Sequence, residues 1–273
     1  MRSLLLVLAL TALTSRAADP SSAPLIIGTS HLFTSEVLKE QRHLNVYLPA
    51  DYGTGEKRYP VIYLLDGGLD QDLLHIVGLL QIGMSNGTMV PAILVGVEST
   101  ERKRDLTGPT QNAEDLKIAP VVGQSATYRT FLETEVLPFI ARTYRENGKR
   151  GIIGESLAGL FVIETFLTQP ALFDSYLAVS PSLWWNDQAL VKSSAAKLKT
   201  LEVTGRTLYV AVEEESLGYG VKDFKAVLKK SAPKSLKWQV DAFPHETHGT
   251  VFHPAALKGF RWVYAPPPAP PAK

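Results

Sequence analysis

Short runs of apolar residues recur along the chain, and most of them show no alternation with polar residues. These runs read YPVIYLLDGG from Tyr59, PAILVGVEST from Pro91, RGIIG from Arg150, SYLAVSPS from Ser175 and TLYVAVEEE from Thr207. Two further segments alternate as half-buried strands do, LNVYLPADY from Leu44 and LKWQVDAFP from Leu236. A strand without polar alternation is typical of a parallel sheet that is covered on both faces. The pattern therefore predicts a mostly parallel central sheet.

Stretches with the helical period lie between these strands. They cover residues 126–144, 157–167, 219–230 and 255–263. Because strands that alternate with helices form crossover units, we expect a three-layer α/β sandwich. In such folds the ligand site forms beyond the carboxyl ends of the strands. Polar residues that directly follow the apolar runs are therefore the candidates for chemistry.

The N-terminus differs from this pattern. Residues 1–17 combine Arg2, an apolar block from Leu4 to Leu13 and small residues up to Ala17. This order is typical of a signal peptide, here with cleavage after Ala17. The block is too short to span a bilayer as a helix, and a hydrophobic N-terminal helix is the alternative. The sequence thus predicts a periplasmic or secreted protein that has no membrane segment after cleavage.

The C-terminus also differs from the rest of the chain. Residues 265–273 read APPPAPPAK, and proline lacks the backbone donor that helices and sheets require. We expect a proline-rich disordered tail there. Residues 18–264 contain no internal repeat, which predicts a single α/β domain.

Composition narrows the classes of function. The chain has 273 residues and a formal net charge of +1, and it contains no cysteine. Near-neutral charge disfavours nucleic acid as a partner. Without cysteine there is no disulfide framework, zinc-cysteine site or iron–sulfur cluster. No sequence feature indicates an oligomeric state.

A serine stands where one predicted strand turns into a helix, in KRGIIGESLAGLFVIETFL. Ser156 has small neighbours two positions away on either side, Gly154 and Ala158. A sharp strand-to-helix corner needs such small residues, and it exposes the serine hydroxyl above the sheet. It also directs the N–H of Leu157, at the helix N-terminus, towards the position of an oxyanion. The alternative is that Ser156 is only an N-cap.

A serine nucleophile needs a base, which is usually histidine and follows the last strand in this architecture. The segment PHETHGTVFHP supplies His245, His248 and His253. His248 is the first candidate because Gly249 allows the loop to bend tightly around the ring. His245 is the second candidate, and a polar loop without a catalytic role is the alternative.

An acid should follow the preceding strand and orient the imidazole. The segment YVAVEEESLG places Glu213, Glu214 and Glu215 there. At least two of the three must belong to an ordinary solvated turn. A second oxyanion donor should come from the loop after an earlier strand, and Gly68 in LLDGG can bring its N–H close to a substrate because it has no side chain.

Several motifs occur together and in a fixed order. They are YPVIYLLDGG, RKRDLTGP, TFLETEVLPFIARTY, GESLAGLF, SPSLWWN and ETHGTVFHPAALKGFRW. The chain resembles the putative esterase family of α/β-hydrolases, which includes enterochelin (ferric-siderophore) esterases, the esterase D-like S-formylglutathione hydrolase and mycolyltransferases. The resemblance extends from about Ser35 to about Tyr264 and implies an α/β-hydrolase fold.

The resemblance also implies site residues. It implies Ser156 as nucleophile, His248 as base, and backbone donors at Leu157 and Gly68. For the acid it favours Glu215, then Glu214. Some siderophore esterases of the family resemble a Ser–His dyad without a well-placed acid. Two departures are Glu155, where many members have histidine before the nucleophile, and Ala158 in place of the last elbow glycine.

Substrate contacts are expected from two of the motifs. The resemblance implies that Trp184 and Trp185 lie near the mouth of the active site, where aromatic faces could stack on an aryl acyl group. Core packing is the alternative for either tryptophan. Arg104 could hold an anionic part of a substrate, and a structural ion pair with Asp105 or another acid is its alternative.

Together these features predict a secreted or periplasmic serine carboxylic-ester hydrolase that acts through an acyl-enzyme. Its partner is a small-molecule ester, and neither a cofactor nor a metal is expected. Siderophore lactones, plant-wall acyl esters and small generic esters fit equally, and we favour a generic carboxylesterase with siderophore-esterase-like relatives. The alternatives are an acyltransferase that uses the same serine, and an inactive binding module on the same fold.

Overall fold

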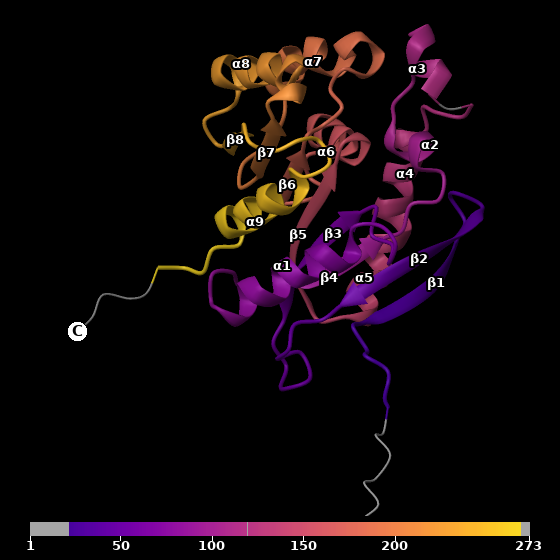
Figure 1. The fold of residues 1–273 in the computed structure, drawn as a ribbon, viewed down its shortest axis with the longest axis vertical. Coiled ribbons are helices and arrows are strands. Elements are labelled where there is room, and N and C mark those ends of the chain that lie inside the picture. The colour runs from indigo at the N-terminus through magenta and orange to yellow at the C-terminus, as the bar shows by residue number, and fades with distance from the viewer. Residues whose placement is uncertain (1–21, 119, 269–273) are drawn as a thin grey trace, which may run out of the picture.

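An eight-stranded sheet forms the centre of the molecule (Figure 1). The computed structural model describes residues 22–118 and 120–268. The strands are β1 (Thr29–Ser35), β2 (Glu40–Tyr47), β3 (Tyr59–Leu65), β4 (Ile93–Val97), β5 (Glu146–Glu155), β6 (Ser175–Val179), β7 (Thr207–Glu213) and β8 (Lys237–Phe243). Their order in the sheet is β1-β2-β4-β3-β5-β6-β7-β8. The β1–β2 and β2–β4 pairs are antiparallel, and all other neighbours are parallel. The expectation of a mostly parallel sheet is confirmed.

Helices cover both faces of this sheet. One face packs against α1 (Leu73–Ser85) and α9 (Phe252–Val263). The other face packs against α4 (Ser125–Phe131), α5 (Leu137–Thr143), α6 (Leu157–Thr168), α7 (Trp185–Leu198) and α8 (Val221–Ser231). Two short helices, α2 (Arg102–Leu106) and α3 (Ala113–Ile118), precede α4. The molecule is therefore a three-layer α/β sandwich, as the sequence predicted (Figure 1).

Strand β3 shows why the central strands lack polar alternation. Val61, Tyr63 and Leu65 belong to the apolar cluster on the α6 face. Ile62 and Leu64 belong to the cluster on the α1 and α9 face. Because side chains alternate between faces, a strand covered on both sides must be apolar at every position.

Several elements were not predicted from the sequence. Strand β1 reads TSHLFTS, with polar residues at most positions, because it lies at the edge of the sheet. Helix α1 reads LLHIVGLLQIGMS, in which apolar residues occur on nearly every side and hide the helical period. Helix α7 reads WNDQALVKSSAAKL, in which polar and small residues leave no continuous apolar stripe.

The helical segment predicted over residues 126–144 is divided. Its middle, η1 (Leu132–Val136), is a π-helical segment between α4 and α5. Pro138 lies at the start of α5 and cannot donate a backbone hydrogen bond to the preceding turn. A widened turn accommodates the missing bond without ending the helix.

The ends of the chain add little to this fold. The predicted signal peptide and its cleavage site after Ala17 lie outside the described residues. Within the predicted tail, residues 265–268 form neither helix nor strand, and the remaining residues lie outside the described part. In the part of the chain that the structure describes, no helix has both the length and the apolar character to span a membrane.

Candidate active site

Ser156 occupies a strained corner between β5 and α6. Its backbone has φ 60° and ψ −118°, a conformation that non-glycine residues rarely adopt. Its N–H donates to the Val179 carbonyl at 3.0 Å, which holds the corner against the neighbouring strand β6. A Cβ added at Gly154 would lie 2.6 Å from the Cβ of Ala158. The small residues of the G-x-S-x-A pattern are therefore required by close packing within the corner.

The side chain of Ser156 is directed into a cavity. In the described structure it makes no capping hydrogen bond to the start of α6, so the N-cap alternative does not account for it. Its Oγ lies 3.3 Å from the Oγ of Ser182. The cavity has a volume of about 700 Å³, and its lining consists of Ser156, Ser180, Pro181, Ser182, Trp184, Glu215, Ser216, Tyr219 and His248. Ser156 and His248, which lie 92 positions apart in the chain, thus share one cavity.

His248 is held from its Nδ1 side. Nδ1 lies 3.2 Å from Oε1 of Glu213 and 2.9 Å from Oγ of Ser180. The imidazole is about half exposed, whereas the carboxylate of Glu213 is fully buried. Among the described residues, no direct hydrogen bond joins His248 to Ser156.

The carboxylate beside His248 is that of Glu213, so the expectation of Glu215 or Glu214 is corrected. Glu213 is the last residue of β7 and is still paired with β8, which turns its side chain inwards to the loop that carries His248. Glu214 and Glu215 follow the end of the strand and are exposed. Glu215 begins the short 3-10 helix η2 (Glu215–Gly218) and lines the cavity without contacting the imidazole.

Hydrogen bonds keep the Glu213 carboxylate ionised. Ser180 Oγ donates to Glu213 Oε1 at 2.9 Å, and Ser216 Oγ donates to the same oxygen. Burial by itself raises the pKa of Glu213, but the hydrogen bonds from Ser216, Ser180, the backbone and His248 outweigh it and lower the pKa. A buried carboxylate that stays charged can orient the ring and stabilise its protonated form.

The two expected oxyanion donors differ in their surroundings. Leu157 is the first residue of α6, where an N–H has no partner within the helix. The N–H of Gly68 donates to the side-chain Oε1 of Gln71 at 2.9 Å. The N–H of Leu157 is thus available to a ligand, whereas that of Gly68 is engaged within the protein.

Comparison with known proteins identifies the family. The family model described as Putative esterase matches residues 35–218, a segment that contains Ser156 and Glu213 and stops before His248. The chain belongs to this family. Ferri-bacillibactin esterase BesA of Bacillus subtilis is 35% identical over 153 residues, which are 50% of this chain and 52% of that protein. Siderophore enterobactin esterase of Emericella nidulans is 26% identical over 163 residues, which are 50% of this chain and 52% of that protein. The chain thus spans about half the length of these two relatives.

A solved structure supports the same assignment. The crystal structure of an IroE-like serine hydrolase from Shewanella oneidensis superposes with a TM-score of 0.77 at 31% identity. The superposition covers 87% of this chain and 80% of that one. This match shows that the protein has an α/β-hydrolase fold.

The two tryptophans of this esterase-family protein have different surroundings. Trp184 is half-buried and lines the cavity beside Ser156. Trp185 is buried in the core, and its Nε1–H donates to the Gly108 carbonyl at 2.8 Å. The expected substrate contact by Trp185 is therefore corrected to core packing, because adjacent residues at the start of α7 point in different directions.

Arg104 is likewise engaged within the protein, in ion pairs. Its guanidinium pairs with Glu40 at 2.7 Å and with Asp105 at 2.7 Å. Arg42, which is fully buried, bridges the same two carboxylates. The expected anion contact by Arg104 is corrected to this ion-pair network, which joins α2 to β2.

Glu155, the residue before the serine, carries an unusual carboxyl group. Its Oε1 is buried without a hydrogen-bond partner among the described residues. Burial raises its pKa to about 8, the carboxylates of Asp72, Glu213 and Asp66 add to that increase, and Arg102 opposes it. The raised pKa favours a neutral carboxyl group next to Ser156 near neutral pH.

Sequence reasoning missed several residues of the site. Ser180 is buried at the carboxyl end of β6 with a positive φ of 41°, and it contacts both Glu213 and His248. Its place directly after the apolar run SYLAV was the available signal. Ser182 and Ser216 follow strands in the same way. In the described residues, no cluster of three or more His, Asp or Glu side chains is arranged to hold a metal.

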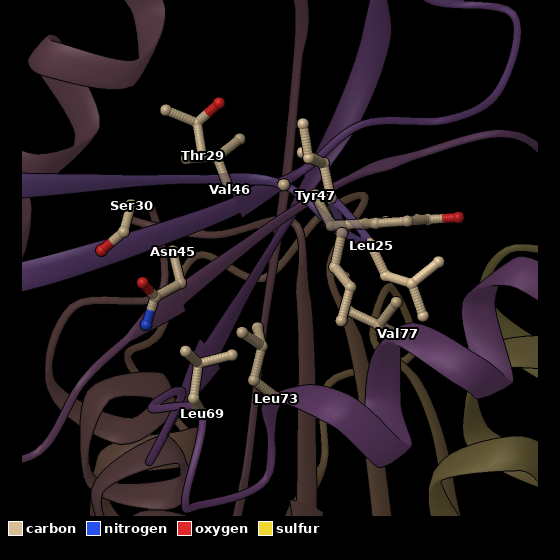
Figure 2. A pocket seen from close by; sticks show the side chains of 12 residues that line it. Leu25, Thr29, Ser30, Asn45, Val46, Tyr47, Leu69, Leu73 and Val77 are labelled. Atoms are coloured by element: carbon tan, nitrogen blue, oxygen red, sulfur yellow. The ribbon is translucent and has the colours of Figure 1, made fainter. Parts of the chain in front are cut away.

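A second cavity has Leu69, from the loop after β3, in its lining. Figure 2 shows this groove of about 280 Å³ between β1, β2 and α1, with the side chains of Leu69, Leu73 and Val77 along one wall. The lining contains none of the described candidates for nucleophile, base or acid. The linings of this groove and of the cavity that contains Ser156 share no residue, so the two cavities are separate.

Proposed function

We propose that this protein is a serine esterase that cleaves carboxylic esters through an acyl-enzyme. The observation that carries the proposal is the strained corner of Ser156 in a cavity shared with His248, whose ring is bound to a buried carboxylate. This combination of nucleophile, base and orienting acid is the arrangement that acyl transfer requires. Membership in the Putative esterase family supports the same activity.

The chemistry follows from the hydrogen bonds of the imidazole. With Nδ1–H donating to Glu213, the unprotonated Nε2 is the nitrogen that accepts the proton of Ser156. Rotation of the Ser156 side chain away from Ser182 brings its hydroxyl to His248, since catalytic hydrogen bonds often form only with substrate bound. The serine oxygen then attacks the carbonyl carbon of the ester, and the Leu157 N–H stabilises the oxyanion that forms. Loss of one such donor costs roughly 3–4 kcal/mol of barrier.

Loss of the alcohol completes acylation, and deacylation then follows. His248 gives its proton to the leaving alcohol, and an acyl-serine remains. In deacylation, water attacks the acyl carbon while His248 removes its proton. The bond from that carbon to Ser156 Oγ then breaks, His248 returns the proton to Oγ, and the carboxylic acid is released. No step of this mechanism calls on a metal or an organic cofactor.

We assign the substrate to small esters of the siderophore type. The relatives named ferri-bacillibactin esterase and siderophore enterobactin esterase support this class. Within the cavity, the exposed ring of Tyr219 and the half-buried ring of Trp184 offer apolar faces to an acyl group. A trilactone, an aryl ester and a series of straight-chain p-nitrophenyl esters would rank the preferences by kcat/KM.

The location is proposed to be the periplasm or the medium, after cleavage of residues 1–17. The N-terminal pattern of the sequence supports this proposal. Expression in a bacterial host with fractionation, followed by N-terminal sequencing, tests it. A mature protein that begins at Ala18 is expected, and a retained Met1 in the cytoplasmic fraction would contradict it.

A fluorophosphonate probe tests the activity. We expect labelling at Ser156 and turnover of p-nitrophenyl acetate, both lost in Ser156→Ala with an unchanged circular dichroism spectrum. Absence of labelling in well-folded protein would favour a binding module on the same fold. Transfer of the acyl group to added glycerol or sugar at the expense of hydrolysis would favour an acyltransferase.

A further inference from the structure

The loop after β3 begins beside the Ser156 corner, because β3 pairs in parallel with β5 and Arg102 binds both Asp66 and the Glu155 carbonyl. The N–H of Gly68 in this loop, which the resemblance implies as an oxyanion donor, is occupied by the protein itself. The N–H of Gly67 is already bound to the Val97 carbonyl of β4 at 2.9 Å. The N–H of Gly68 is the next along the chain, and it donates to Oε1 of Gln71 at 2.9 Å. Because an N–H carries a single hydrogen, a linear bond to Gln71 and a linear bond to an oxyanion exclude each other.

The amide of Gln71 is fixed in this position from its other side. Its Nε2 donates to the Ser99 carbonyl at 3.0 Å, and its Oε1 also accepts the Ser99 N–H at 3.2 Å. The side-chain amide thus makes two hydrogen bonds with the backbone of Ser99, which follows β4. If Gly68 is released, Oε1 of Gln71 still has the Ser99 N–H as a donor, so no buried acceptor is left unpaired.

Residue 68 is shaped for this contact. A Cβ at Gly68 would lie 2.9 Å from Oε1 and 3.1 Å from Cδ of Gln71. Glycine is therefore needed for the amide to approach the backbone so closely. The remainder of the loop is fixed by other contacts, since Asn45 Nδ2 donates to the Gly67 carbonyl at 2.9 Å and Arg102 pairs with Asp66 at 2.8 Å.

We propose that Gln71 is a positioning residue that controls the second oxyanion donor of the site. This inference rests on the proposed esterase function. In the free protein the amide holds the Gly68 N–H, and it gives up that N–H only to an acceptor that binds more strongly. A neutral ester carbonyl is a weaker acceptor than an amide oxygen, whereas an oxyanion forms a hydrogen bond roughly twice as strong as a neutral acceptor does. The Gly68 N–H therefore binds the oxyanion only in the transition state. Its hydrogen bond to Gln71 must break at that point, which raises the barrier and slows the chemical step.

The substitution Gln71→Met tests this proposal, because methionine has a similar length and lacks the amide. A neutral hydrogen bond shifts an equilibrium by roughly 2- to 10-fold, so we expect kcat for p-nitrophenyl acetate to rise by a factor in that range. KM should stay within about twofold of the wild type, since the ground state does not use the donor. An arylboronic acid, which forms a tetrahedral anionic adduct with the serine, should bind more tightly by the same factor.

Asp70→Asn is the matched control, since Asp70 is exposed on the same loop. It should leave kcat, KM and boronate affinity unchanged. Gln71→Glu provides a second test that retains the shape of the side chain. Its second carboxylate oxygen would face the Ser99 carbonyl in place of Nε2. The side chain should therefore either hold the Gly68 N–H more tightly and lower kcat about 10-fold or more, or leave this position and raise kcat as methionine does.

The outcomes separate this inference from the proposed function. If wild-type protein neither hydrolyses esters nor reacts with a fluorophosphonate at Ser156, the esterase proposal itself fails. If the wild type is active and folded Gln71→Met shows an equal or lower kcat and unchanged boronate affinity, the role of Gln71 is refuted while the esterase stands. A Gln71→Glu enzyme with wild-type kcat would refute it as well, even if the methionine variant failed to fold.

Discussion

Single side chains at the ends of the parallel strands decide what this site can do. Three consecutive glutamates span the end of β7, and only Glu213, the last residue of the strand, makes a hydrogen bond with His248. The exposure of Glu214 shows that one step along the chain moves a carboxylate from a buried, hydrogen-bonded place to solvent. The residue type was visible in the sequence, but the end of the strand was not.

We expect Glu213→Gln to lower kcat for p-nitrophenyl acetate by roughly 10²- to 10⁴-fold. The amide keeps the shape of the side chain but can no longer stabilise a protonated imidazole or enforce the tautomer. Glu214→Gln is the control and should stay within about twofold of the wild type. Equal losses in the two variants, or none in either, would argue against Glu213 as the orienting acid.

At the scale of elements, the corner between β5 and α6 depends on the absence of side-chain atoms. The Cβ that Gly154→Ala introduces meets the Cβ of Ala158 at 2.6 Å, which requires a backbone shift. We expect the free energy of unfolding to fall by about 1–3 kcal/mol. The shift would also displace the Ser156 hydroxyl, so turnover should fall with it.

Gly78→Ala in α1 is the matched control for that substitution. A Cβ at Gly78 would meet no described atom within 4 Å, and the residue lies in the interior of a helix. Alanine should therefore stabilise the protein by about 0.5–1 kcal/mol. Urea unfolding of both variants measures the contrast, and similar changes of the same sign would show that the corner is not tightly packed.

At the scale of the whole molecule, the buried carboxyl of Glu155 makes stability depend on pH. Burial, together with the nearby carboxylates of Asp72, Glu213 and Asp66, raises its pKa from 4.5 to about 8, although Arg102 opposes the change. Between these two values the folded protein retains a proton that the unfolded chain has lost. Its contribution to stability is therefore complete below pH 4.5 and is lost as the pH rises towards 8.

The substitution Glu155→Gln should remove this dependence. Near pH 4.5 the variant and the wild type should be equally stable, and at pH 9 the variant should be more stable by on the order of 1–2 kcal/mol. This figure is smaller than the full pKa difference implies, because the group is only partly shielded from water. Denaturant unfolding across this pH range measures the difference, and a constant difference would contradict a buried, protonated Glu155.

The sequence by itself determined the layers of the fold and the place of Ser156, the proposed nucleophile. Short apolar runs without alternation indicated strands covered on both faces, and the spacing of Gly154, Ser156 and Ala158 is a local requirement of one sharp turn. The location of His248 followed from chain order after the last strand. These features depend on neighbours in the sequence, so they can be read without coordinates.

Tertiary structure decided the contacts between segments that are far apart in the chain. It placed Glu213, and not Glu215, beside His248 and buried Trp185 in the core. It also paired Arg104 of α2 with Glu40 of β2, and the side-chain amide of Gln71 with the backbone of Ser99. The direction of a side chain after a strand ends depends on the register and packing of neighbouring strands, and no periodic pattern in the sequence records that.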